Sequence, residues 1–250
     1  MPLQVFTLRE RPDLRPVIFS DNFGPSIWPE YMLHDEVARL YFSPPFLDQY
    51  LDFVLIGIDG DEVVARGFSV PFAFNFPGRE ELPDGGWDEV IRWAHEDLHV
   101  HRNPTAVSAL EISLLPQARS RGHSRWMLEA MKANTRTRGF ADLFAPVRPS
   151  EKHLQPFKSM REYLDEPRAD GLPHDAWLRT HVRVGGRIVK IAPYAMTIVG
   201  SVGQWSKWTG MTFEKSGFVA VAGALSPICI SLEQNFGVYV EPGVWVHHVV

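Results

Sequence analysis

The chain has 250 residues, of which 45% are hydrophobic and 22% are charged, and its formal net charge is -5. This composition is typical of an ordinary globular protein and excludes a disordered chain. The net charge is negative and no run of Lys or Arg is longer than two residues. Both features argue against nucleic acids and anionic membranes as partners.

A cytoplasmic location is expected from three features of the sequence. The single cysteine, Cys229, cannot form an internal disulfide. The N-terminal residues lack the basic-then-apolar order of a signal peptide. The most apolar stretches are far shorter than the roughly 18 residues needed to cross a bilayer, so no transmembrane segment is predicted.

The first half of the chain is predicted to contain short helices followed by a β-hairpin. Residues 27–51 are compatible with two short helices that meet at a bend, which two consecutive prolines mark. Residues 52–59 and 62–74 are β-prone runs on either side of an Asp-Gly turn, a strong hairpin signal. Residues 75–105 hold several prolines and glycines around one candidate helix at 87–98, and are predicted to be an insertion between strands.

The middle of the chain is predicted to form a strand–helix–strand unit. Residues 107–115 and 141–147 are the strands, and residues 124–138 form an amphipathic helix between them. Ser124 is a candidate N-cap of this helix, and Gly139 is a candidate C-terminal stop. Such a unit crosses over right-handedly and makes its two strands parallel, so the sheet is mixed.

The remaining sequence indicates a second insertion and a β-rich extension. Residues 148–173 are polar and proline-rich, residues 175–184 are helical, and residues 187–192 return as a strand. No repeat or long linker divides the chain, so we expect a single domain over 1–250, with insertions at about 75–105 and 148–173 and an extension after about 192. Short strands are predicted in the extension at 217–222, 227–232, 236–240 and 244–249.

The most informative segment is the loop between the strand at 107–115 and the helix that follows it. A strand that turns through a glycine-containing loop into a helix presents successive backbone N–H groups and the positive end of the helix dipole. These groups bind phosphate or pyrophosphate, and Arg119 and Arg121 add positive charge. A polar turn with two solvated arginines is the alternative interpretation.

This loop resembles the pyrophosphate loop of the GNAT superfamily of acyl-CoA N-acyltransferases, which has the pattern Q/R-x-x-G-x-G/A. Arg119-Ser120-Arg121-Gly122-His123-Ser124 matches the first and fourth positions, and Ser124 replaces the final Gly or Ala. The resemblance covers roughly residues 27–192 and implies an α/β fold with a mixed, mostly antiparallel central sheet flanked by helices. It implies acetyl-CoA or another acyl-CoA as co-substrate. The residues implied to contact it are Ile112, Leu114, Leu115, Arg119, Ser120, Arg121, Gly122, His123 and Ser124.

Two residues are candidates for catalysis. Within Trp177–Gly186, His181 falls where the family carries the tyrosine that protonates the leaving thiolate, and an imidazolium is a competent acid near neutral pH. A structural histidine is the alternative. Glu111 is the only carboxylate on its strand and is a candidate general base or amine anchor. Its alternative is a strand residue that faces outward, because a period of two permits either face.

The acceptor is expected to be a small-molecule amine. Arg148 and Lys152 follow the strand at 141–147, and they either bind phosphate or an acidic substrate or are ordinary solvated charges. The segments 145–152 and 170–179 resemble a bacterial GNAT-like group. The long insertions leave two alternatives, which are acyl transfer from an acyl carrier protein and decarboxylation of a malonyl thioester. A non-catalytic acyl-CoA sensor is a third.

A competing signal is the zinc pattern H-E-x-x-H, which His95-Glu96-Asp97-Leu98-His99 satisfies. The pattern places two imidazoles on one helix face, with a glutamate base between them. The extension found in one large group of such proteases needs a glycine and a third histidine, but those positions hold Arg102 and Thr105. We therefore expect no metal, and prefer a lid helix with exposed histidines over a metalloprotease.

Overall fold

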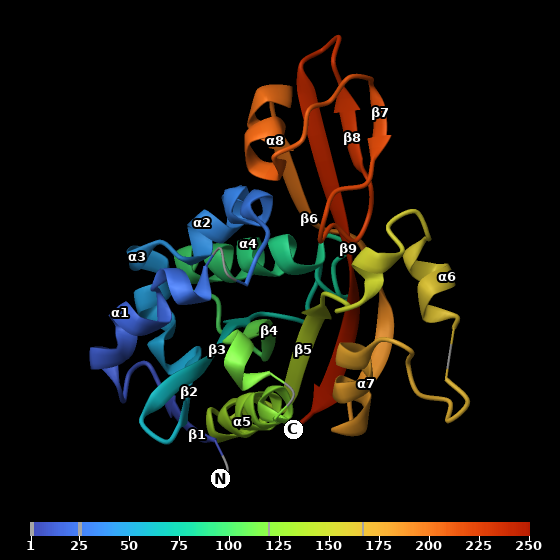
Figure 1. Ribbon diagram of the computed structural model, residues 1–250. Helices are drawn as coiled ribbons and strands as arrows, with labels where there is room; N and C mark the ends of the chain where they lie inside the picture. Colours follow the sequence, from blue (N-terminus) through green and yellow to red (C-terminus); the bar gives the residue numbers. More distant parts are fainter. Residues whose placement is uncertain (1–2, 25–26, 120, 167) are drawn as a thin grey trace.

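A computed structural model describes residues 3–24, 27–119, 121–166 and 168–250. In this part of the chain nine strands form one sheet, in the order β1-β2-β3-β4-β5-β9-β8-β7, with β6 paired to the free side of β9. Every pairing is antiparallel except the one between β4 and β5. The mixed, mostly antiparallel sheet flanked by helices that the sequence predicts is confirmed (Figure 1).

The strands are β1 (Gln4–Thr7), β2 (Val54–Asp59), β3 (Glu62–Phe72), β4 (Ala106–Leu114), β5 (Asp142–Val147), β6 (Arg187–Gly200), β7 (Gly217–Val219), β8 (Ile228–Ser231) and β9 (Phe236–Val249). The α-helices are α1 (Arg15–Ile18), α2 (Glu36–Tyr41), α3 (Pro44–Leu47), α4 (Gly86–His99), α5 (His123–Thr137), α6 (Met160–Leu164), α7 (Ala176–Arg183) and α8 (Val202–Thr209). Short 3-10 helices lie at Pro12–Leu14, Asp21–Phe23, Glu30–His34, Asp48–Phe53, Pro116–Ala118 and Lys152–Leu154. Among the described residues, none of these helices is long and apolar enough to cross a membrane.

The helices cover both faces of the sheet. Met127 and Met131 of α5 pack against Gly67 of β3, where an added Cβ would lie 3.1 Å from the nearest methionine carbon. The neighbouring residue of β3, Arg66, points to the other face and donates to the carbonyl of Ile18 at the end of α1. Since α4 also packs on this second face, α5 and the N-terminal helices enclose the sheet from opposite sides (Figure 1).

The strand–helix–strand unit has the predicted order β4-α5-β5, but its helix starts differently from the expectation. Ser124 is not the N-cap. Gly122 is, with a φ of +78°, and no side chain caps the helix. A left-handed backbone before the first helical residue suits glycine, because it has no Cβ to clash. At the other end, Gly139 has a φ of +85°, so the predicted stop is confirmed.

The C-terminal extension is more continuous than its sequence suggests. Two strands were expected at 236–240 and 244–249, but β9 runs unbroken over 14 residues and β6 also has 14. The Pro-Gly pair at 242–243 does not end β9, because the register with β6 shifts there, between Ala192 and Met196. The end of β6 and the start of β9 project as an arm with α8, β7 and β8 (Figure 1). A second hydrophobic cluster joins this arm to Tyr31 and Met32 of the 3-10 helix Glu30–His34.

Candidate active site

The parallel strands β4 and β5 separate soon after they begin to pair. Val107 pairs with Leu143 and Ser108 with Phe144, and beyond these two pairs the described strands form no further pairing with each other. The rest of β4 remains paired on its other side, with β3. The divergence therefore leaves one side of β4 open over its second half.

Backbone groups of β4 line this opening. The N–H of Leu115 donates to the carbonyl of Val64 at 2.9 Å, so this amide is engaged by the β3 side. N–H groups alternate in direction along a strand, so those of Ile112 and Leu114 face the open side. The amides of Ile112 and Leu114 thus lie on the open side of β4, whereas the Leu115 amide is bonded to β3 and is not free to contact a ligand.

The loop that follows β4 leads into α5 through Gly122. Arg119 is exposed, and the side chain of Arg121 is 62% exposed and lies 3.3 Å from Asp59 at the β2–β3 turn. His123 is buried, with Nε2 3.4 Å from the same carboxylate. The first N–H groups of a helix, here those of His123 and Ser124, have no intrahelical partner, and such groups suit an anion. Ser120 lies outside the described residues.

Glu111 points to the face of the sheet that the N-terminal helices cover. Its Oε1 accepts from Nε of Arg66 at 2.7 Å, and the two side chains are 10% and 9% exposed. The guanidinium lies over the rings of Phe23 and Phe68. Glu111 is therefore an inward, ion-paired carboxylate beside the opening, and the alternative of an outward-facing strand residue is wrong.

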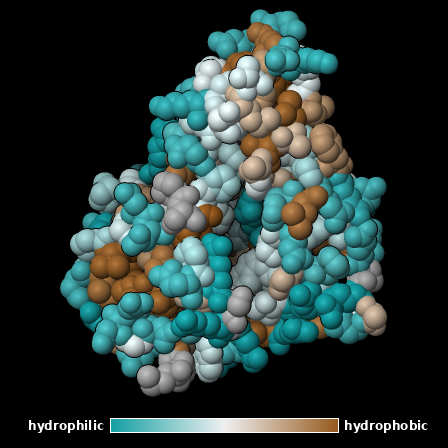
Figure 2. Space-filling model, viewed as in Figure 1, coloured by the Kyte–Doolittle hydropathy of each residue, from teal (hydrophilic) through white to brown (hydrophobic). Residues whose placement is uncertain are grey.

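The surface is hollowed in front of this opening. Figure 2 shows a depression between the N-terminal helices on one side and the α6–α7 region on the other, and Figure 1 shows β4 and β5 diverging behind it. The open strand edge and the anion site at the start of α5 border the same region of the sheet. This arrangement suits a long ligand with an anionic end at the helix and an amide-bearing arm along β4.

Comparisons with known proteins agree with this geometry. Arginine N-acetyltransferase avaD of Aspergillus versicolor is 29% identical over an alignment 272 positions long, gaps included, which covers 98% of this chain and 93% of that protein. The loading GNATL domain of CurA from Lyngbya majuscula has a TM-score of 0.54 at 17% identity, over 99% of this chain and 97% of that one. The GNAT-like decarboxylase GphF, in complex with isobutyryl-CoA, has a TM-score of 0.56 at 15% identity, over 98% of each chain. No protein-family model matches the chain.

The chain has the GNAT fold over nearly its whole length. Its similarity to an arginine N-acetyltransferase agrees with the resemblance that the loop and the order of elements indicated. The GNAT core here carries an additional helix, α4, between β3 and β4, and the arm formed by α8, β7 and β8 between β6 and β9. Both additions lie in segments that the sequence analysis marked as an insertion or an extension.

His181 does not have the environment of a proton donor. It is 2% exposed, and its Nδ1 lies 2.9 Å from Nε2 of His248 on β9. Burial, and then the neighbouring His248, lower the pKa of His181 to about 3, so the imidazole is neutral at pH 7. The expectation of an imidazolium acid at this position is wrong for this structure, and the alternative of a structural histidine fits.

Arg148 is partly buried and Lys152 is buried, and both side chains are hydrogen-bonded within the protein. Nε of Arg148 donates to both carboxylate oxygens of Glu241 at 3.0 Å, and its Nη2 donates to the carbonyl of Gly223. Lys152 is 1% exposed, and its Nζ donates to two backbone carbonyls. Burial, and then Lys158, lower the pKa of Lys152. These residues connect the end of β5 to the arm, and Lys152 is neither a solvated charge nor exposed to a ligand.

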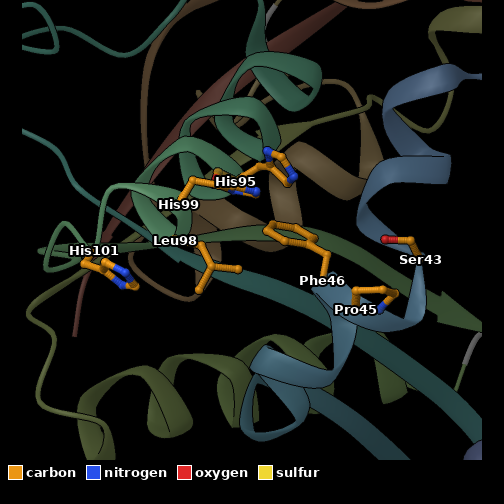
Figure 3. A pocket seen from close by; sticks show the side chains of 7 residues that line it. All are labelled: Ser43, Pro45, Phe46, His95, Leu98, His99 and His101. Atoms are coloured by element: carbon orange, nitrogen blue, oxygen red, sulfur yellow. The ribbon is translucent and has the colours of Figure 1, made fainter.

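The zinc pattern forms no metal centre. His95 and His99 lie on one face of α4 and line a surface pocket of about 460 Å³ with Phe46 and Leu98 (Figure 3). Nδ1 of His99 is 2.8 Å from the carbonyl of His95, and the two rings lie 4.2 Å apart. No group of three or more His, Cys, Asp or Glu side chains in the described residues is placed to hold a metal ion. Glu96 instead pairs with Arg79.

One residue of the opening was missed by sequence reasoning. The indole N–H of Trp87, at the start of α4, donates to the carbonyl of Leu110 at 2.9 Å. The sequence placed Trp87 in the insertion, next to the pair of glycines at 85–86, but gave no signal that this helix reaches β4. The contact is a product of tertiary packing.

Proposed function

We propose that this protein is an acyl-CoA-dependent N-acyltransferase that moves an acetyl group from acetyl-CoA to the amine of a small molecule in the cytoplasm. The observation that carries the proposal is the divergence of β4 from β5, together with the left-handed Gly122 at the start of α5, the next α-helix along the chain. A single ligand with a pyrophosphate and an amide-bearing arm matches both features. The name of the avaD relative, an arginine N-acetyltransferase, supports this activity and suggests an amino acid or a related amine as acceptor.

The proposed position of CoA follows from these features. The pyrophosphate lies against the N–H groups that follow Gly122, with Arg119 and Arg121 adding charge. The pantetheine arm runs along β4 and pairs with the backbone at Ile112 and Leu114. The thioester then reaches the point where β4 and β5 separate.

Glu111 is proposed to take the proton of the attacking amine, directly or through water. It is the carboxylate of β4 on the face opposite α5, and Arg66 fixes its orientation. The neutral amine attacks the thioester carbon, and β4 N–H groups stabilise the oxyanion. The intermediate collapses, the C–S bond breaks, and the proton held by Glu111 returns through water to the thiolate. The products are an amide and CoA with a free thiol.

A second candidate donor is the phosphopantetheine arm of an acyl carrier protein. Two solved structures with TM-scores above 0.5 are a loading GNATL domain and a GNAT-like decarboxylase, and they support this second candidate. The same open edge of β4 accepts either arm, because both carry the same pantetheine amides. The anion site at α5 separates the two donors, since a carrier-bound arm lacks the CoA pyrophosphate.

A product assay tests the proposal. Purified protein is mixed with acetyl-CoA, or with an acetylated carrier protein, and a panel of amines that includes arginine, and acetylated products are identified by mass spectrometry. We expect transfer from acetyl-CoA. Glu111→Gln is expected to lower kcat by about 100-fold or more, whereas Glu129→Gln, on the exposed ion pair of α5, leaves kcat unchanged. Transfer from the carrier alone would favour the second candidate, and binding without transfer would indicate a sensor.

A further inference from the structure

Trp87 contacts β4 at Leu110, a residue that pairs with neither neighbouring strand. Leu110 is skipped in the register with β3, because Ala109 pairs with Ser69 and Glu111 pairs with Phe68. A bulged residue such as Leu110 is left out of the ladder between β4 and β3. On the other side of β4, the pairing with β5 has already ended at Ser108. The indole N–H, 2.9 Å from the Leu110 carbonyl, supplies the hydrogen bond that neither strand supplies.

The helix that carries Trp87 is fixed firmly at its start. Gly86 has a φ of +47°, and a Cβ at this position would lie 2.6 Å from Cβ of Ala195 on β6. Oδ2 of the Asp88 carboxyl group accepts from the backbone N–H of Thr197 on the same strand, at 3.2 Å. Because the residues on both sides of Trp87 are anchored to β6, the indole reaches β4 from a rigid support.

We propose that Trp87 is a positioning residue for acyl transfer, which holds the bulge of β4 in place and keeps the strand apart from β5 where the thioester enters. This inference rests on the proposed acyltransferase function. A peptide group is planar, so fixing the Leu110 carbonyl also fixes the N–H of Glu111 in the same plane. As a consequence, the second half of β4 keeps its direction. This half carries the open N–H groups and the Glu111 carboxylate.

The inference predicts a specific kinetic signature. The hydrogen bond lies beside the reacting end of the arm, whereas the nucleotide end of CoA is held at the start of α5. Loss of the indole N–H should therefore lower kcat, by about 10- to 100-fold if the thioester and the amine are misplaced by up to 1 Å. KM for acetyl-CoA should change by less than about threefold, since binding at the loop is untouched.

Two variants separate the hydrogen bond from the ring. Trp87→Phe removes the donor and part of the ring, and Trp87→3-benzothienylalanine, made by stop-codon suppression, replaces only the N–H with sulfur. Trp93→Phe is the matched control, because Trp93 lies on the same helix but packs against Phe72 and Arg79 instead of Leu110. Thermal unfolding is measured for each variant, so that a loss of folding is not mistaken for a loss of positioning.

The readouts are steady-state kinetics and the infrared carbonyl band of bound acetyl-CoA labelled with ¹³C at the thioester. We expect both Trp87 variants to lose kcat and to bring the bound carbonyl band back toward its position in water, with Trp93→Phe unchanged. A benzothienylalanine variant with the kcat and the band of the wild type would overturn the role of Trp87. Failure of the wild type to bind acetyl-CoA would instead remove the proposed function itself, and the infrared test keeps the two failures apart even if the acceptor amine is unknown.

Discussion

Replacing Gly122 by alanine tests the anion site against a control built into the same helix. Gly122 precedes the first residue of α5 with a φ of +78°, and Gly139 follows the last turn with a φ of +85°. At both positions an added Cβ would meet no described atom within 4 Å. Gly122→Ala and Gly139→Ala therefore cost only the left-handed backbone strain, about 1 to 2 kcal/mol each.

The two variants differ in what the Cβ meets when acetyl-CoA binds. A strain of this size should lower the melting temperature of each variant by about 2 to 8 °C for a chain of this length. At Gly122 the new methyl group also occupies the space that the pyrophosphate oxygens need at the helix start. We expect the Kd for acetyl-CoA to rise at least about tenfold in Gly122→Ala, which corresponds to about 1.4 kcal/mol. Gly139→Ala should bind acetyl-CoA as the wild type does.

Isothermal titration calorimetry with acetyl-CoA, together with differential scanning calorimetry, measures both effects. Similar melting temperatures with a difference in affinity would support the anion site. Equal affinities for acetyl-CoA in the two alanine variants would refute the placement of the pyrophosphate at the start of α5.

Three further predictions concern buried titratable groups and the zinc pattern. Burial lowers the pKa of His181 to about 3 and that of His248 to about 4, below the ordinary value of 6.5, so the free energy of unfolding is unaffected by these groups above pH 6.5 and falls as the pH drops toward the lowered values. Urea unfolding should show a loss on the order of 2 kcal/mol from His181 alone between pH 7 and pH 5. A His181→Gln variant with the same pH dependence as the wild type would contradict this. Burial, and then Asp35, raise the pKa of Asp88 from 3.8 to about 8, so Asp88 lowers the stability of the fold increasingly as the pH rises through this range. Asp88→Asn should therefore raise the melting temperature at pH 8. A lower melting temperature in this variant would count against a protonated carboxyl. His95→Ala combined with His99→Ala should change neither the zinc content nor the transfer rate, and a stoichiometric zinc ion that disappears in the double variant would revive the metal site.

The parts of the site that the sequence could predict are those made by local backbone geometry. A strand, a glycine-containing loop and an amphipathic helix follow one another in the chain, so the loop and the left-handed conformation of Gly122 are properties of one continuous segment. The short helices at 27–51 and the hairpin around Gly60 were predictable for the same reason. The N-cap of α5 is Gly122, two residues before the predicted Ser124, because glycine and serine are both acceptable N-caps when only the local sequence is considered.

The parts that could not be predicted depend on which side chains meet across the sheet. His181 matches a family tyrosine in spacing, but it lies three residues after Leu178 on the buried face of α7, and it meets His248 from the distant β9. This i, i+3 spacing from an apolar residue was a signal that could have favoured burial. The contact between Trp87 and Leu110 joins an insertion to β4 and has no local signature. The interpretation of the chain as a single domain stays a prediction.

Hydrogen–deuterium exchange with and without acetyl-CoA tests the central claim most directly, because it reports where on the chain the ligand protects backbone amides. The account predicts slower exchange in peptides from residues 110–124, which include the open half of β4 and the start of α5, and little change in the arm at 201–235. Protection confined to another region, or binding of acetyl-CoA without protection of residues 110–124, would contradict the placement of the acyl-CoA site.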